Sequence, residues 1–132
     1  MTEPTYYVSF WFREILVPVD GSASSLKALD LAVDFARRYG SRITVLAAVR
    51  GDPEQVRRAV ESRVGGVAPY GFKYAKLDEA TSPANEILKE LGTGKYDAVI
   101  IGARGLTVSD VNIGSTAMAV VANAPVTAII VR

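Results

Sequence analysis

The feature that most constrains the fold is a regular alternation of short apolar runs with longer segments of helical periodicity. The runs that read as strands cover residues 14–19, 43–49, 72–77, 96–101 and 126–131. The segments that read as helices lie between them, over residues 22–40, 53–64, 82–92 and 115–123. Such alternation is typical of βαβ units with right-handed crossovers. It predicts an α/β fold with a single open, mainly parallel five-stranded sheet, in the order 3-2-1-4-5, and helices on both faces.

The length of the chain, 132 residues, suits one domain with a single core. We expect that domain to occupy residues 13–132, after an aromatic extension over residues 1–12. The extension contains Tyr6, Tyr7, Phe10, Trp11 and Phe12. Because so many rings are unfavourable in water, the segment is expected to pack on the domain or on a second subunit. A partner-binding arm is the alternative.

Composition excludes several kinds of chemistry. The chain contains no cysteine and no histidine, so it can form no disulfide, thiolate metal site, cysteine nucleophile or Ser-His-Asp triad. The formal net charge of +1 gives no argument for binding nucleic acid or an acidic membrane. The first residues lack the features of a signal peptide, and no apolar run is long enough to cross a bilayer. We therefore expect a cytoplasmic protein that binds neither nucleic acid nor membrane.

A glycine-rich segment follows the fourth predicted strand. It runs Gly102-Ala103-Arg104-Gly105 and, after eight further residues, continues as Gly114-Ser115-Thr116 at the start of a predicted helix. Glycines let the backbone approach a ligand closely, and a helix N-terminus offers unpaired N–H groups that suit an anion. Hydroxyls of Ser115 and Thr116 would add contacts to a terminal phosphate. The alternative is that the glycines serve turns and that Ser115 only caps the helix.

A second polar turn, Asp20-Gly21-Ser22, ends the first predicted strand. In an open parallel sheet, ligands bind beyond the carboxyl ends of the strands, where the strand order reverses. The first and fourth strands flank that point, so Asp20 and the glycine-rich segment are expected to face one crevice. Asp20 has a functional interpretation, in which it contacts a ribose hydroxyl or holds a metal near the phosphates, and a structural one, in which it stabilises its turn or caps the helix. Arg104 either pairs with a phosphate or is a solvated surface residue.

Several segments in combination resemble the universal stress protein (UspA-like) family. They include ILVPVDGS at residues 15–22 and YDAVIIG at residues 96–102, together with residues 25–29, 82–87 and 124–131. The resemblance extends from about Arg13 to the C-terminus and leaves the first twelve residues as an extension. It implies a five-stranded α/β domain that is usually a homodimer and that in some members binds ATP or another adenine nucleotide.

The resemblance also implies roles for individual residues. In members that bind ATP the motif is G-x2-G-x9-G-[ST], which would place at the phosphates Gly102, Gly105, Gly114 and Ser115, with Thr116 beside them. Asp20 would lie near the ribose, Pro18 and Val19 would lie against the adenosine, and Val49 would meet the adenine through its backbone. This chain has eight residues between Gly105 and Gly114 where the family motif has nine, so this loop is one residue shorter.

Three functions are compatible with this pattern. The leading hypothesis is an ATP-binding stress-response protein that acts as a regulatory switch or sensor, with Mg²⁺ bridging phosphate oxygens. No residue is predicted to be catalytic or to ligate a metal, because no general base is recognisable, so an efficient enzyme is not expected. The alternatives are a dimeric interaction module without nucleotide and a slow ATPase on the same fold.

The last predicted strand suggests how two copies would meet. The strand from Val126 to Val131 is apolar and carries no charge before Arg132. An exposed edge of this kind is usually paired or covered. We expect a homodimer in which this strand pairs with its copy in antiparallel orientation across a two-fold axis.

Overall fold

The computed structural model describes residues 11–104 and 113–132. Its strands are β1 (Glu14–Pro18), β2 (Arg42–Val49), β3 (Tyr70–Lys76), β4 (Ala98–Gly102) and β5 (Thr127–Val131). Its helices are α2 (Ala23–Tyr39), α3 (Pro53–Val64), α4 (Pro83–Leu91) and α5 (Ser115–Asn123). The elements therefore alternate along the chain as the sequence predicts.

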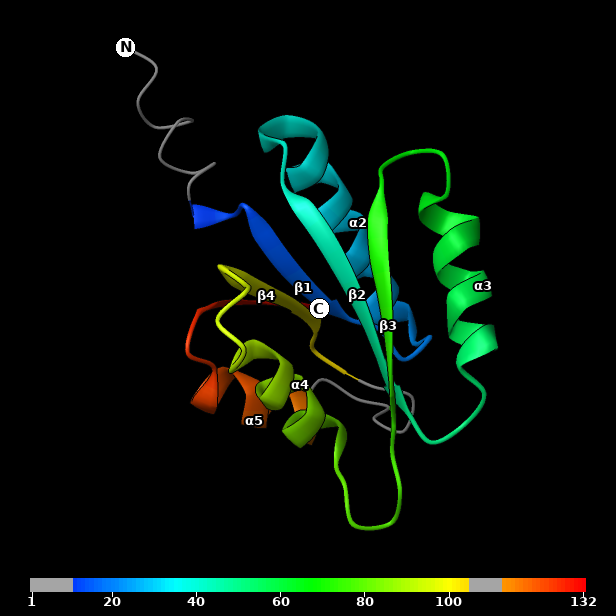
Figure 1. Ribbon diagram of the computed structural model, residues 1–132, viewed down its shortest axis with the longest axis vertical. Coiled ribbons are helices and arrows are strands. Elements are labelled where there is room, and N and C mark those ends of the chain that lie inside the picture. The colour runs from blue at the N-terminus through cyan, green and yellow to red at the C-terminus, as the bar shows by residue number, and fades with distance from the viewer. Residues whose placement is uncertain (1–10, 105–112) are drawn as a thin grey trace.

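The strands form one sheet in the order β3-β2-β1-β4-β5, and every neighbouring pair is parallel. This confirms the predicted fold class and strand order. Helices α2 and α3 cover one face, and α4 and α5 cover the other (Figure 1). Two apolar cores result, one on each side of the sheet. The interior strand β4 is buried along its whole length, as expected for a parallel strand covered on both faces.

Local capping residues fix where most helices begin. The side chains of Ser22, Asp52 and Ser82 accept backbone N–H groups at the starts of α2, α3 and α4. Gly40 ends α2 in the left-handed region, with φ of 73°. Helix α5 differs, because its N-cap is Gly114 and, among the described residues, no side chain caps it. Ser115 is the first helical residue, so the alternative that it serves as the N-cap is wrong.

Strand β3 starts earlier than the sequence predicts. The sequence pattern indicates a loop before Phe72, yet Tyr70 and Gly71 already pair with Ile43 and Thr44 of β2. The ladder continues because β2 offers partners at these positions, and the Tyr70 ring packs against the core under α2 and α3. Neither cause is visible in the local sequence.

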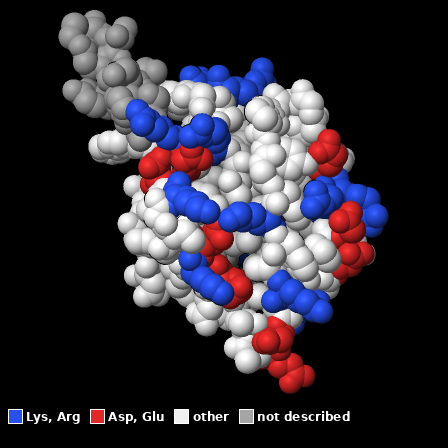
Figure 2. Space-filling model, viewed as in Figure 1, with Lys and Arg blue, Asp and Glu red and all other residues white. Residues whose placement is uncertain are grey.

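One face of the molecule carries charges of both signs, and the first described residues differ in how they pack. Figure 2 shows basic and acidic side chains interspersed over the face on which β3 and α4 lie, and one such pair joins Lys73 to Glu90. Phe12 packs on Phe35 of α2, with ring centroids 5.0 Å apart, whereas Trp11 is 66% exposed. The rest of the aromatic extension, with Tyr6, Tyr7 and Phe10, lies outside the described residues. None of the described helices has the length and apolarity needed to cross a membrane.

Candidate functional site

A cavity of about 440 Å³ opens at the carboxyl ends of the strands. Its walls come from the ends of β1, β2 and β4 and from the starts of α3, α4 and α5. Strand β1 is followed by β2 on one side, whereas β4 lies on its other side, so the cavity is at the point where the strand order reverses. This is the position at which open α/β sheets bind ligands.

The structure brings nine of the ten predicted site residues to this cavity. They are Pro18, Val19, Asp20, Val49, Gly102, Arg104, Gly114, Ser115 and Thr116. The tenth, Gly105, lies outside the described residues. Residues from four separate segments thus face one space, although no ligand contact follows from this arrangement alone.

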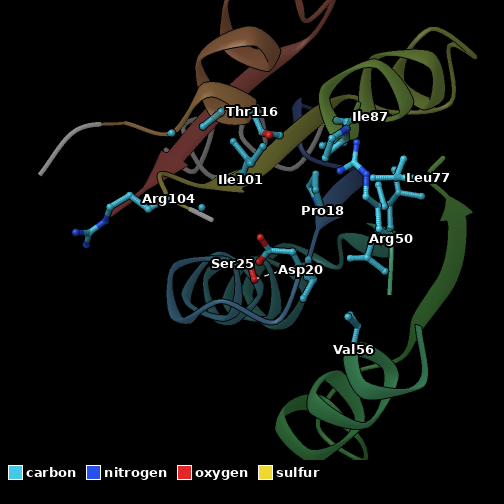
Figure 3. Close-up of a pocket in the computed structure, with 18 of the residues that line it drawn as sticks. Pro18, Asp20, Ser25, Arg50, Val56, Leu77, Ile87, Ile101, Arg104 and Thr116 are labelled. Atoms are coloured by element: carbon cyan, nitrogen blue, oxygen red, sulfur yellow. Dashed lines mark hydrogen bonds between the residues drawn. The ribbon is translucent and has the colours of Figure 1, made fainter. Parts of the chain in front are cut away.

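Asp20 stands at the end of β1 on one side of the cavity, opposite Thr116 of α5 (Figure 3). Its Oδ1 accepts the backbone N–H of Ser22 at 2.9 Å, and its own N–H donates to Ser25 Oγ at 3.4 Å. The carboxylate therefore stabilises its turn, while Ser22 and not Asp20 caps α2. Within the described part of the chain, Oδ2 has no hydrogen-bond partner, which leaves one oxygen for a ligand.

Two buried serines at the start of α2 hold the strand ends together. Ser22 Oγ donates to the carbonyl of Arg104 at 3.3 Å. Ser24 Oγ accepts the N–H of Arg104 at 3.1 Å and donates to the carbonyl of Val131 at 3.4 Å. The ends of β4 and β5 are thereby fixed to α2. From sequence these serines indicated only a helix cap, because their partners are 80 or more residues away.

Gly102 is required by close packing between β4 and α2. A Cβ at this position would lie 2.4 Å from Ser24 Oγ and 2.6 Å from both the Ser24 carbonyl carbon and the Ser25 nitrogen. Two of these atoms belong to the backbone and cannot rotate away. The glycine therefore lets the end of β4 approach the start of α2, which brings the following residues to the cavity.

Two backbone hydrogen bonds set the start of α5. The N–H of Gly114 donates to the carbonyl of Ala103 at 2.6 Å, and the N–H of Ala103 donates to the carbonyl of Val131 at 2.7 Å. Ala103 and Gly114, which lie on either side of residues 105–112, are thus held together. Gly114 uses its N–H in this way, so the first-turn N–H groups of Ser115 and Thr116 are the ones at the positive end of the helix.

Arg104 contributes to the cavity mainly through its backbone. Both its N–H and its carbonyl bond to serines of α2. Its side chain extends away from Asp20 and Thr116 in Figure 3. The predicted phosphate contact of Arg104 therefore has no support from the position of its guanidinium in this structure.

The sequence interpretation missed the other side of the cavity. Arg50 at the end of β2, Val56 of α3, Leu77 after β3 and Ile87 of α4 all line it. Val56, Leu77 and Ile87 are almost completely buried. Each comes from a different element, so no local motif joins them; the only available signal was their position next to strand ends or on the inner faces of helices.

Glu90 holds α4, which carries Ile87, against the sheet. Its Oε2 accepts Lys73 Nζ at 2.8 Å and the hydroxyl of Tyr96 at 2.6 Å. Burial alone would raise the pKa of the Glu90 carboxyl, but these hydrogen bonds outweigh it and leave that pKa below its usual value. Burial and the hydrogen bond to Glu90 raise the pKa of the Tyr96 hydroxyl to about 12.

The chain matches proteins that are already known. The model of the universal stress protein family matches residues 12–68 and 68–132. A "Universal stress protein in QAH/OAS sulfhydrylase 3'region" from Thermus aquaticus is 29% identical over 136 residues, which cover 92% of this chain and 99% of that protein.

Solved structures share the fold. A universal stress protein in complex with cAMP has a TM-score of 0.74 at 22% identity, over 91% of this chain and 96% of that chain. The universal stress protein from Archaeoglobus fulgidus in complex with dAMP has a TM-score of 0.65 at 21% identity, over 92% and 98% of the two chains.

Proposed function

This chain belongs to the universal stress protein family, and from that premise we propose that its cavity binds an adenine nucleotide, with ATP as the ligand. The observation that carries the proposal is that Asp20, Val49 and the start of α5 line one cavity of about 440 Å³. Two structures of the same fold are complexes with cAMP and dAMP, which supports an adenine ligand.

The cavity suits each part of such a ligand. Val49, Leu77 and Ile87 offer an apolar surface to the base. Asp20 Oδ2 is placed to accept a ribose hydroxyl. Ser115 and Thr116 present hydroxyls and first-turn N–H groups to the phosphates, at a helix start that no described side chain caps. The bond from Gly114 to Ala103 supports this arrangement despite the shortened loop.

Mg²⁺ would accompany the triphosphate rather than occupy a site of its own. The structure, over the residues that it describes, contains no group of three or more acidic residues that could hold a metal ion. Mg²⁺ keeps several waters and is commonly held by phosphate oxygens together with one or two carboxylates. Phosphate oxygens and water would supply most of these ligands, because the available oxygen of Asp20 is the one proposed to accept the ribose hydroxyl.

We propose that the bound nucleotide serves a regulatory switch or sensor. The chain has no histidine or cysteine to act as a general base or nucleophile. Asp20 already accepts a backbone N–H. These features support binding and release more than efficient hydrolysis.

The test begins with purified protein. After denaturation, any released nucleotide is identified by chromatography and mass, and Mg-ATP binding to the emptied protein is measured by calorimetry. ATP or ADP in the released fraction supports the proposal. If no nucleotide is released and no Mg-ATP binds, the alternative of a dimeric interaction module replaces it.

A substitution at Gly114 tests the position of the phosphates. Gly114 has φ of −65° and ψ of 157°, which other residues adopt readily, so Gly114→Val should fold. Its side chain would occupy the space at the start of α5, and we expect ATP binding to be lost. Ala122→Val, on the exposed face of the same helix, is the matched control and should bind ATP as the wild type does. Unchanged affinity in the Gly114 variant contradicts the assignment.

We also propose that the protein forms a homodimer through β5. This strand is at the edge of the sheet and is only partly buried in the single chain. The exposed apolar side chains of Met118 and Val121 lie on α5, the helix that precedes it. Sedimentation velocity over a dilution series should show a dimer that dissociates on dilution; a monomer at all concentrations contradicts this proposal.

A further inference from the structure

Two arginines line the cavity among the residues that the structure describes, and they lie on opposite sides of it (Figure 3). Arg104 is on the side of β4 and α5. Arg50 is at the end of β2, on the apolar side with Leu77 and Ile87. Arg50 is an exposed residue, and the same side of the cavity also carries the polar residues Asp52 and Gln55, so its guanidinium lies beside the apolar wall and away from the proposed phosphate contacts.

The side chain of Arg50 reaches from β2 toward the start of α4. Its Nη2 donates to the carbonyl of Thr81 at 3.0 Å. The turn that carries this carbonyl is fixed, because Asp78 Oδ1 accepts the N–H groups of Ala80 at 2.8 Å and of Thr81 at 3.0 Å. Hydrogen bonds to the Asp78 carboxylate also keep its pKa below the usual value.

The charge of Arg50 is not neutralised by this contact. Its partner in the described part of the chain is a neutral carbonyl, and no ion pair of that part includes Arg50. A guanidinium is planar and weakly hydrated, and it stacks favourably on aromatic faces. A guanidinium that is held by a neutral carbonyl and lies next to the apolar residues Leu77 and Ile87 is therefore suited to an aromatic ring system.

We infer that Arg50 is a specificity-determining residue for the base, and that its guanidinium lies against the face of a purine in the apolar half of the cavity. This inference rests on the proposed function and adds the residue that selects the ligand class. A purine presents a larger face to the guanidinium than a pyrimidine does. Because the contact is to the base, its strength does not depend on the number of phosphates.

The experiment measures by calorimetry the affinities of adenosine, AMP, ATP and cytidine for wild type, Arg50→Ala and Arg50→Lys. Arg58→Ala, an exposed position on α3 outside the cavity, is the control with the same change of net charge. Arg50→Ala should weaken adenosine, AMP and ATP by the same factor, about fivefold. Arg50→Lys should weaken binding of these ligands almost as much, because lysine retains the positive charge but lacks the planar guanidinium. The preference for adenosine over cytidine should narrow in both variants.

Other outcomes overturn the inference. If the loss of affinity in Arg50→Ala increases from adenosine to AMP to ATP, Arg50 interacts with the phosphates. If the affinity for adenosine is unchanged in Arg50→Ala, Arg50 does not contact the base. Full recovery in Arg50→Lys excludes stacking. Failure of the wild type to bind any of these compounds overturns the proposed function, and this inference with it, whereas binding by the wild type without an effect at Arg50 overturns the inference alone.

Discussion

The two halves of the cavity are constructed differently. On the side of β4 and α5, the wall consists of backbone, glycines and hydroxyls, held by hydrogen bonds among Ser24, Ala103, Gly114 and Val131. On the side of β2, α3 and α4, the wall consists mainly of apolar side chains, together with Arg50, Asp52 and Gln55. The first half depends on how closely two backbones approach, and the second depends on how separate elements pack.

This difference determines how each half responds to change. A backbone wall has no side chains that can repack, so a single added methyl group is costly. A wall of side chains tolerates exchange of individual groups but depends on the elements that carry them. Substitutions at Gly102, Tyr96, Asp20 and Thr116 separate these two behaviours, and their expected effects decrease in that order.

Gly102→Ala should have the largest effect. The new Cβ would lie within 2.6 Å of two backbone atoms of α2, so the start of α2 or the end of β4 must move. We expect the free energy of unfolding in urea to fall by about 3 kcal/mol, the upper range for overpacking. Gly51→Ala, also at the cavity but with no atom within 4 Å of its Cβ, should change stability by much less. Equal effects at the two positions contradict the distinction between the halves.

The pH dependence of stability tests the anchoring of α4. The pKa of the Tyr96 hydroxyl is about 12 in the folded protein and 10.0 in a free tyrosine. Between these values the unfolded chain loses the proton first, so stability is complete below pH 10 and falls as the pH rises toward 12. We expect the Tyr96 contribution to this fall to be at most about 2 kcal/mol. Urea unfolding of Tyr96→Phe over the same pH range should show a shallower decline, and a decline as steep as in the wild type contradicts the prediction.

Asp20→Asn tests the boundary between the halves. Asparagine keeps an oxygen that can accept the Ser22 N–H, so stability should change little, but it removes the charge proposed to face the ribose. We expect adenosine to bind about tenfold more weakly, as for loss of a hydrogen bond to a charged group. Calorimetry with 2′,3′-dideoxyadenosine is the internal control, because it lacks the 2′- and 3′-hydroxyls and its affinity should be the same for variant and wild type. A loss of equal size for both nucleosides shows that Asp20 does not contact the ribose.

Thr116→Val should have the smallest effect and sharpen the assignment of the backbone half. The substitution keeps the shape of the side chain and removes its hydroxyl. ATP should bind about threefold more weakly, because one neutral hydrogen bond is lost, while adenosine should be unaffected. Calorimetric titration with both ligands measures this ratio, and a loss of adenosine affinity contradicts the prediction.

Most of the fold could be predicted from sequence because its signals are local. Helix α2, for example, is identified without any tertiary information by its apolar periodicity, its N-cap Ser22 and its C-cap Gly40. The start of β3 at Tyr70 could not be predicted, because its ladder depends on β2.

The site divides in the same way. The turn at Asp20 and the glycine-rich segment were visible as local motifs, and the structure brings Asp20 and the described parts of that segment, residues 102–104 and 114–116, to one cavity. Arg50, Leu77 and Ile87 were not predicted, since they meet only after three separate crossovers have formed. The part of a binding site that is made by turns is therefore easier to predict from a sequence than the part that is made by side chains of separate elements.

The carbonyl of Val131 connects the edge of the sheet to the cavity. It accepts hydrogen bonds from both Ser24 Oγ and the N–H of Ala103, so β5 is part of the frame that holds the start of α5. A shift of β5 by one residue would break both bonds. If a second chain pairs with β5, it either leaves this carbonyl in place or displaces it, and displacement would change the free energy of binding in the cavity. In the second case, association of the two chains changes the affinity of the cavity for a nucleotide by some factor. Thermodynamic linkage requires that a bound nucleotide change the association constant of the two chains by the same factor.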